Sequence, residues 1–117
     1  MSVVNKLCMS MIFQIEAKSE KAKSTMNNRI KKELENVLGT LNLILEYDKQ
    51  TNSFVYLEED TKESFDEKAI FLLKTLQHFG YAYVVTGNLS DNHFDICTSK
   101  TNMSGICFIQ GQLFYEN

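Results

Sequence analysis

Apolar and polar side chains alternate along several short segments of the chain, and two longer segments repeat their apolar residues every three or four positions. In residues 9–15 every odd position is apolar, which is typical of a strand with one buried face. Residues 41–48 alternate in the same way, and an apolar run at 54–57 resumes after a polar stretch at 49–53. This pattern predicts a hairpin with a loop of about five residues.

The two segments with the longer period predict amphipathic helices. The first covers residues 25–38, with Ser24 as the expected N-cap and Gly39 as the residue that ends the helix. The second is predicted to run from Ser64, which forms a capping box with the glutamate three residues later, to Gly80. The apolar residues that define its core face are Phe65, Ala69, Leu72, Leu73, Leu76 and Phe79.

Residues 81–85 follow this helix and are almost continuously apolar, as expected of a central strand buried on both faces. Two further strands, at 94–99 and 106–115, come after a turn at 87–92. The order β-α-β-β-α-β-β-β matches a ferredoxin-like core with a hairpin added at the C-terminus. We therefore expect a single α+β domain over residues 1–117, a two-layer sandwich with a mostly antiparallel sheet and two helices on one face.

Composition limits the ligands and the cellular compartment that we expect for this domain. The chain of 117 residues is 44% hydrophobic and carries a formal net charge of −3, which disfavours a surface built to bind the phosphates of nucleic acid. Its three cysteines, Cys8, Cys97 and Cys107, fit free thiols in a reducing compartment. Neither a signal peptide nor a membrane span is recognisable in the sequence, so we expect a cytoplasmic protein without membrane association.

Charge is segregated along the chain. Residues 18–33 hold six basic and two acidic side chains, whereas residues 58–68 hold six acidic side chains and two lysines. The acidic run leads into the first turn of the second helix, where carboxylates complement the exposed backbone amides. It also forms a surface that would attract a basic protein.

The second helix carries more apolar residues than one buried face can use. Ile70 projects almost opposite its core face and Phe71 lies just off the edge of that face. Phe71 has a partner within the fold if it packs on the first helix, whereas Ile70 indicates contact with another protein or with a second copy in a homodimer.

These patterns predict a small non-catalytic protein-binding module that acts as an inhibitor, adaptor or regulator of a larger protein. The larger protein would be basic or itself a nucleic-acid-binding protein. The predicted contact residues are Glu58, Glu59, Asp60, Glu63, Asp66, Glu67, Ile70 and Phe71.

Two alternatives stay open. A nucleic-acid-associated regulator would use the basic segment from Lys18 to Lys32, although no aromatic residue is interleaved there to stack on bases. A thiol- or metal-dependent enzyme would use one face of the strand at 94–99 together with Cys107, which would lie opposite Cys97 if the turn is centred on Asn102. Its residues would be His93, Asp95, Cys97 and Cys107.

The spacing of these four residues argues against metal binding. No Cys-x-x-Cys pair is present, and ligands in a row along one strand converge poorly. The thiols are therefore predicted to pack as small apolar side chains, with no bound metal or cofactor.

Overall fold

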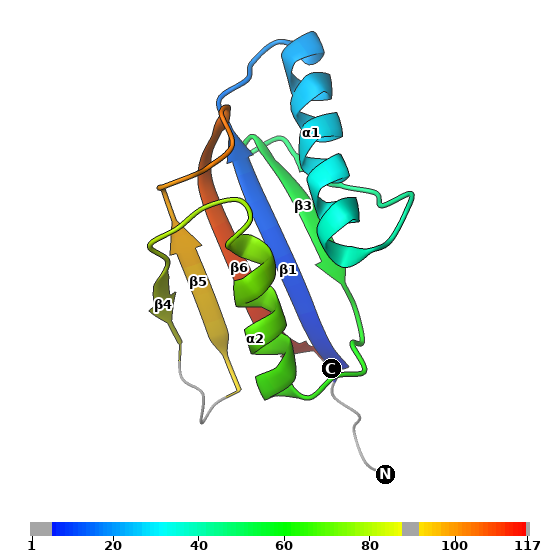
Figure 1. The fold of residues 1–117 in the computed structure, drawn as a ribbon, viewed down its shortest axis with the longest axis vertical. Helices are drawn as coiled ribbons and strands as arrows, with labels where there is room; N and C mark the ends of the chain where they lie inside the picture. The colour runs from blue at the N-terminus through cyan, green and yellow to red at the C-terminus, as the bar shows by residue number, and fades with distance from the viewer. Residues whose placement is uncertain (1–5, 88–91, 117) are drawn as a thin grey trace.

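The computed structural model describes residues 6–87 and 92–116, and Figure 1 shows their arrangement. Within these residues, two helices and six strands follow the predicted order, so the α+β fold class is confirmed. The turn predicted at 87–92 lies largely outside the described residues. The elements are β1 (Lys6–Ile15), α1 (Glu20–Leu38), β2 (Glu46–Asp48), β3 (Ser53–Glu58), α2 (Phe65–Leu76), β4 (Val84–Thr86), β5 (Phe94–Thr98) and β6 (Ile106–Glu116).

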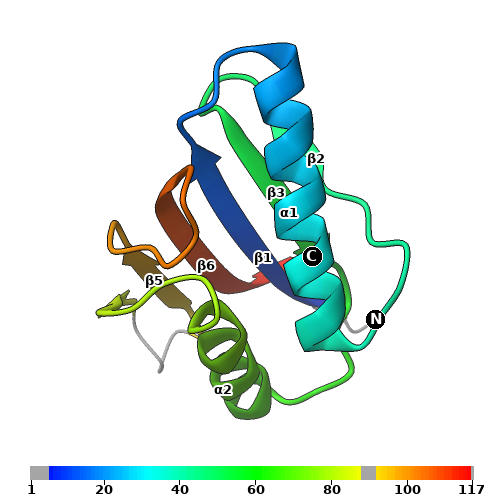
Figure 2. The ribbon, with the colours of Figure 1, turned by 45° about the horizontal axis from the view of Figure 1, so that its top comes forward.

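The strands form one sheet in the order β2-β3-β1-β6-β5-β4, and each strand is antiparallel to its neighbours. Both helices cover the same face of this sheet, as Figure 2 shows from a second direction. The last strand, β6, lies beside β1 and completes the ferredoxin-like set β2-β3-β1-β6. The predicted C-terminal hairpin is present as β5 and β6, but the two strands added beside the ferredoxin-like set are β4 and β5.

The core lies between the helices and the covered face of the sheet. Phe79, just after α2, packs on Phe13 of β1 with the ring centroids 4.7 Å apart. The alternation in β1 is confirmed, because its odd-numbered residues are buried in this layer: Leu7, Met9, Met11, Phe13 and Ile15. The helical period of α1 is confirmed by its buried residues, Met26, Ile30 and Leu34.

The structure differs from the prediction at the start of α1, which begins at Glu20. Ser19, not Ser24, is the N-cap, and its hydroxyl accepts a hydrogen bond of 3.1 Å from a backbone N–H of the first turn. Lys23 need not enter the core, because its Nζ lies 5.0 Å from the centroid of the Tyr47 ring and 3.6 Å from Glu20 Oε1. Its long stem therefore allows the helix to start earlier than the apolar pattern predicts.

The predicted strand at 41–48 is reduced to the three residues of β2. The residues before β2 form a loop, because Asn42 has a left-handed φ of 64° that an extended strand does not allow. Leu43 anchors this loop: its side chain is buried, and its N–H donates a hydrogen bond of 3.1 Å to the Glu35 carboxylate on α1.

Residues 81–85 are not a central strand. β4 is limited to Val84–Thr86 and lies at the end of the sheet, where it pairs with β5. Ala82 has a φ of 56°, so the chain turns before the strand begins. Val84 and Val85 are 59% and 57% exposed. The apolar pattern thus predicts that the side chains of this strand are buried, whereas the edge of the sheet leaves them exposed.

The second helix starts as predicted but ends earlier. Ser64 is the N-cap of α2, and its hydroxyl accepts a hydrogen bond of 3.3 Å from the Glu67 N–H. The helix ends at Leu76, whose carbonyl accepts hydrogen bonds from the Tyr83 hydroxyl at 2.6 Å and from the Gly80 N–H at 3.1 Å. Burial raises the pKa of Tyr83 well above its ordinary value, so this hydroxyl stays a donor at neutral pH.

The position of α2 is set by a close approach to β6. A Cβ atom at Gly111 would lie 2.6 Å from Cδ1 of Leu76 and 3.0 Å from Cδ1 of Leu72. Both leucines are fully buried, so they have little room to move away. Gly111 therefore allows the helix to lie close against the middle of β6.

We expect Gly111→Val to lower the free energy of unfolding by about 1–3 kcal/mol, because the added carbons overpack this contact. Urea denaturation followed by circular dichroism measures the change. Cys97→Val adds volume on the face of β5 that no helix covers, so it should change the free energy by no more than about 0.5 kcal/mol. Equal losses in the two variants would contradict the close approach.

Candidate functional site

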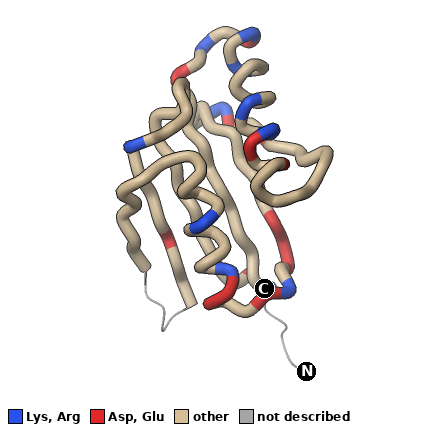
Figure 3. The backbone as a smooth tube through the Cα atoms, in the orientation of Figure 1, with Lys and Arg blue, Asp and Glu red and all other residues tan. Residues whose placement is uncertain are grey.

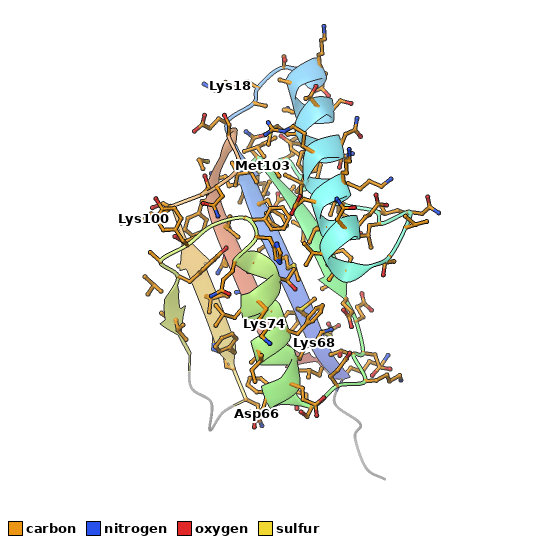
Figure 4. All side chains as sticks on the ribbon, in the orientation of Figure 1. Lys18, Asp66, Lys68, Lys74, Lys100 and Met103 are labelled. Atoms are coloured by element: carbon orange, nitrogen blue, oxygen red, sulfur yellow. The ribbon has the colours of Figure 1, made fainter. Side chains whose placement is uncertain are left out.

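A buried lysine organises the place where β3 ends and α2 begins. Lys68 is only 2% exposed, and its Nζ lies 3.1 Å from each carboxylate oxygen of Glu58. The same Nζ lies 3.7 Å from Glu63 Oε2 and 4.2 Å from the centroid of the Phe71 ring. Because an unpaired buried charge is costly, these contacts are what make the burial of Lys68 tolerable. Figure 4 shows Lys68 on the side of α2 that faces β1 and β3.

Glu63 is held by a second partner besides Lys68. The Thr61 hydroxyl donates a hydrogen bond to its carboxylate, and this bond, more than the nearby ammonium, holds the pKa of Glu63 below its ordinary value. Thr61 is itself buried, and its N–H donates a hydrogen bond of 2.8 Å to the carbonyl of Leu7. The loop before α2 is thus fixed to β1 and to the lysine together.

The structure divides the predicted contact residues into two groups. The first group is engaged within the fold: Glu58 and Glu63 form ion pairs with Lys68, and the carboxylate of Asp60 lies 3.6 Å from Nζ of the exposed Lys62. Phe71 is half-buried against the core and under the Lys68 ammonium, so little of it is available to a partner.

The remaining predicted residues form what we call the α2 acidic surface: Glu59, Asp66, Glu67 and Ile70. Its three carboxylates are exposed and make no ion pair with the part of the chain that the structure describes. Ile70 is 57% exposed, in agreement with its expected projection away from the core.

The charges separate along the molecule as well as along the sequence. Lys18 and the first turns of α1 lie at one end of the longest axis (Figure 4), and Figure 3 shows acidic residues around the start of α2 at the other end. The protein therefore presents a basic end and an acidic end to its surroundings.

Part of the basic segment is used within the fold. Arg29 donates a hydrogen bond of 3.0 Å from Nη1 to the carbonyl of Ser104, and Lys23 is held between Glu20 and the Tyr47 ring. Lys18, Lys21 and Lys32 remain exposed. The surface left for nucleic acid is smaller than the count of basic residues in the sequence indicates.

The residues of the alternative thiol or metal site are not brought together. The register pairs Cys97 with Gln110, so the expected position of Cys107 opposite Cys97 is wrong. Cys107 Sγ instead lies 3.5 Å from the carbonyl oxygen of Gln14. His93, which precedes β5, is exposed. Within residues 6–87 and 92–116, no three His, Cys, Asp or Glu side chains are arranged to hold a metal ion.

Asp95, the remaining residue of that alternative, belongs to a polar network on the face of the sheet opposite the helices. Gln110 Nε2 donates to both of its carboxylate oxygens, at 3.3 and 3.2 Å, and Gln112 Nε2 donates to Oδ2 at 3.0 Å. Ser10 Oγ completes the network with a hydrogen bond of 3.4 Å to Gln112 Oε1. These contacts satisfy the carboxylate with amide donors, as in a structural network.

Sequence reasoning missed two exposed apolar surfaces. Leu41 and Ile44, on the loop before β2, are 80% and 82% exposed. Leu43, Ile44 and Leu45 are consecutive, so a signal was present: three adjacent side chains cannot all point into one core. The second surface is the β4 edge, where Tyr81 is 55% exposed beside the two valines of the strand.

A hollow of about 420 Å³ lies between α2 and this β4 edge. Leu73 of α2 and Gln77, just after the helix, line it on one side, and Tyr81, Tyr83 and Val85 line it from the strand side. Another hollow, of about 560 Å³, lies beside the first turns of α1 and is lined there by Ala22, Thr25 and Met26.

Neither helix in the described part of the chain is both long enough and apolar enough to cross a membrane. Comparisons with protein-family models, with curated proteins and with solved structures found no match to this chain. A function must therefore be inferred from the surfaces themselves.

We expect Glu58→Gln to lower the free energy of unfolding by about 2 kcal/mol or more, because it leaves the buried Lys68 ammonium without its closest counter-charge. Glu59→Gln is the matched control: the neighbouring carboxylate is exposed and unpaired within the described chain, so the change should stay within about 0.5 kcal/mol. Urea denaturation gives both values.

The same substitution in a protein without the lysine isolates the contact between Glu58 and Lys68. In a Lys68→Met protein, Glu58→Gln should cost much less than in the wild type, because the charge to be compensated is gone. An undiminished cost in that background would show that Glu58 stabilises the fold by another route.

Proposed function

We propose that this chain is a small non-catalytic protein-binding module that acts as an inhibitor, adaptor or regulator of a larger protein with a basic surface. The observation that carries the proposal is the position of Ile70. Its side chain is 57% exposed on α2, about one helical turn after the exposed carboxylates of Asp66 and Glu67. An exposed apolar side chain bordered by charge resembles the anchor and rim of a protein interface.

The contacts around Lys68 support this use of the helix. Glu58 and Glu63 tie the buried side of the first turn to β3 and to the preceding loop. The α2 acidic surface therefore sits on a fixed support, and little ordering would be needed when a partner binds.

Charge would contribute mainly to the approach of the partner. The acidic residues around the start of α2 lie together at one end of the molecule (Figure 3), so a basic protein would be attracted to that end before contact. Ile70 would then supply the apolar contact that slows dissociation.

The two alternatives have less support. Arg29 and Lys23 of the basic segment are engaged within the fold, and the described cysteine, histidine and aspartate side chains of the thiol or metal alternative do not converge. Cys8, Cys97 and Cys107 are free, which supports a reducing compartment, and we propose a cytoplasmic location on that basis.

The test is affinity capture from a lysate of the native host with the full chain as bait, followed by mass spectrometry and by binding measurements with the purified captured protein. Ile70→Glu should weaken binding by about tenfold or more, because it puts a charge at the apolar anchor. Asp66→Lys combined with Glu67→Lys should slow association and reduce its salt dependence. Glu58 is left unchanged in these variants, since its loss would disturb Lys68.

Ile44→Glu is the matched control, because Ile44 is the same residue type and is 82% exposed on a different part of the molecule. It should bind the captured protein as the wild type does. The proposal fails if no protein is captured, or if Ile70→Glu and Ile44→Glu bind the captured protein equally well.

A further inference from the structure

β4 is an edge strand whose side chains do not suit an edge. Within the described residues it pairs with β5 on one side only. Val84 and Val85 point to opposite faces of the sheet, and both are more than half exposed. An edge with apolar side chains and unpaired backbone groups is a template for pairing with another strand.

The other edge of the sheet is protected differently. β2 carries Glu46 and Asp48, two carboxylates within three residues. A second copy brought to this edge would place like charges beside each other, which opposes pairing. By contrast, residues 81–87 contain no charged side chain. Of the two edges, β4 is therefore the one that a second copy can approach without repulsion between like charges on the strands.

The sequence of this segment fits the same conclusion. The nearly continuous apolar run at 81–85 predicts a strand whose side chains are covered, yet the structure gives β4 a neighbouring strand on one side only and leaves Val84 and Val85 exposed. We propose that two copies of the chain pair through the outer edges of their β4 strands, antiparallel about a two-fold axis, so that their sheets become one continuous sheet. β4 then has a neighbouring strand on both sides, and its valines gain cross-strand contacts.

The symmetry of this pairing limits its extent. An antiparallel pair of identical edges uses the same surface on both copies, so it closes as a dimer and leaves no second β4 edge for growth. The β2 strands, with their carboxylates, become the two outer edges of the combined sheet. Such an arrangement protects the molecule from open-ended association.

Charge is compatible with this orientation. The strands run roughly along the long axis of the molecule (Figure 1), so an antiparallel pair reverses that axis between the two copies. The basic end of one copy then lies on the same side as the acidic end of the other (Figure 3). Charges more than about 8–10 Å apart are largely screened at physiological ionic strength, so this complementarity favours the orientation more than the affinity.

The axis also keeps both helix layers on the same side of the combined sheet. Each copy brings its own Tyr81, Val85 and adjoining hollow to that side, next to the junction. The α2 acidic surface is not part of the junction, so the dimer and the partner-binding proposal can fail independently.

Sedimentation velocity on the full chain, from roughly 1 µM to roughly 1 mM, tests the dimer over the range of weak to moderate affinities. We expect the wild type to change from the monomer mass of 13.5 kDa to twice that mass as concentration rises. Val84→Lys should remain a monomer, because a lysine puts a charge on each of the two β4 edges and removes an apolar side chain from the junction. Ile44→Lys, at an exposed site away from β4, should dimerise as the wild type does.

Circular dichroism verifies that each variant is folded, and Thr86→Lys replaces Val84→Lys if the latter is not. Amide hydrogen exchange provides a second reading: the backbone of β4 should become more protected as the wild type dimerises, and it should stay unprotected in the monomeric variant. A wild type that remains monomeric throughout the range overturns the proposal. So does a folded β4 lysine variant that dimerises as strongly as the wild type.

Discussion

The close approach of α2 to β6 at Gly111 determines how the rest of the molecule is exposed. Because a glycine faces Leu72 and Leu76, the helix can lie directly over the middle of the sheet. From that position it buries the covered face of β6 and β5 but does not reach across β4, whose valines stay exposed. The same position turns Ile70 away from the core. The exposure of Ile70 and that of the β4 valines thus follow from one packing contact.

Lys68 divides the acidic run before and within α2 into carboxylates that support the fold and carboxylates that stay exposed. This lysine is buried because two carboxylates and an aromatic ring receive its charge, and it thereby joins the helix to β3. The carboxylates that it does not use are exposed on the same turn of helix. Structural support and the proposed partner recognition are therefore adjacent but depend on different side chains.

Much of the fold follows from local patterns: the buried alternation of β1, the stripe of α1, and the helix ends at Gly39 and Ser64 are confirmed. What the sequence does not contain is the order of strands. An apolar run such as 81–85 predicts a central strand, but it does not say whether the neighbouring strands belong to the same chain or to another one. The register of Cys97 likewise depends on the length of a turn, and Asn42 ends an apparent strand through a backbone angle that no hydrophobic pattern encodes.

The exposed position of Ile70 could be predicted because it depends only on helical geometry, whereas the burial of Lys68 could not, because it depends on partners from three segments. The central claim is that α2 holds the fold with one side and leaves the other side free. Urea unfolding of Leu72→Ala and Ile70→Ala tests it most directly. The account predicts a loss of about 2–5 kcal/mol for Leu72→Ala and no more than about 0.5 kcal/mol for Ile70→Ala. Comparable losses in the two variants would contradict it.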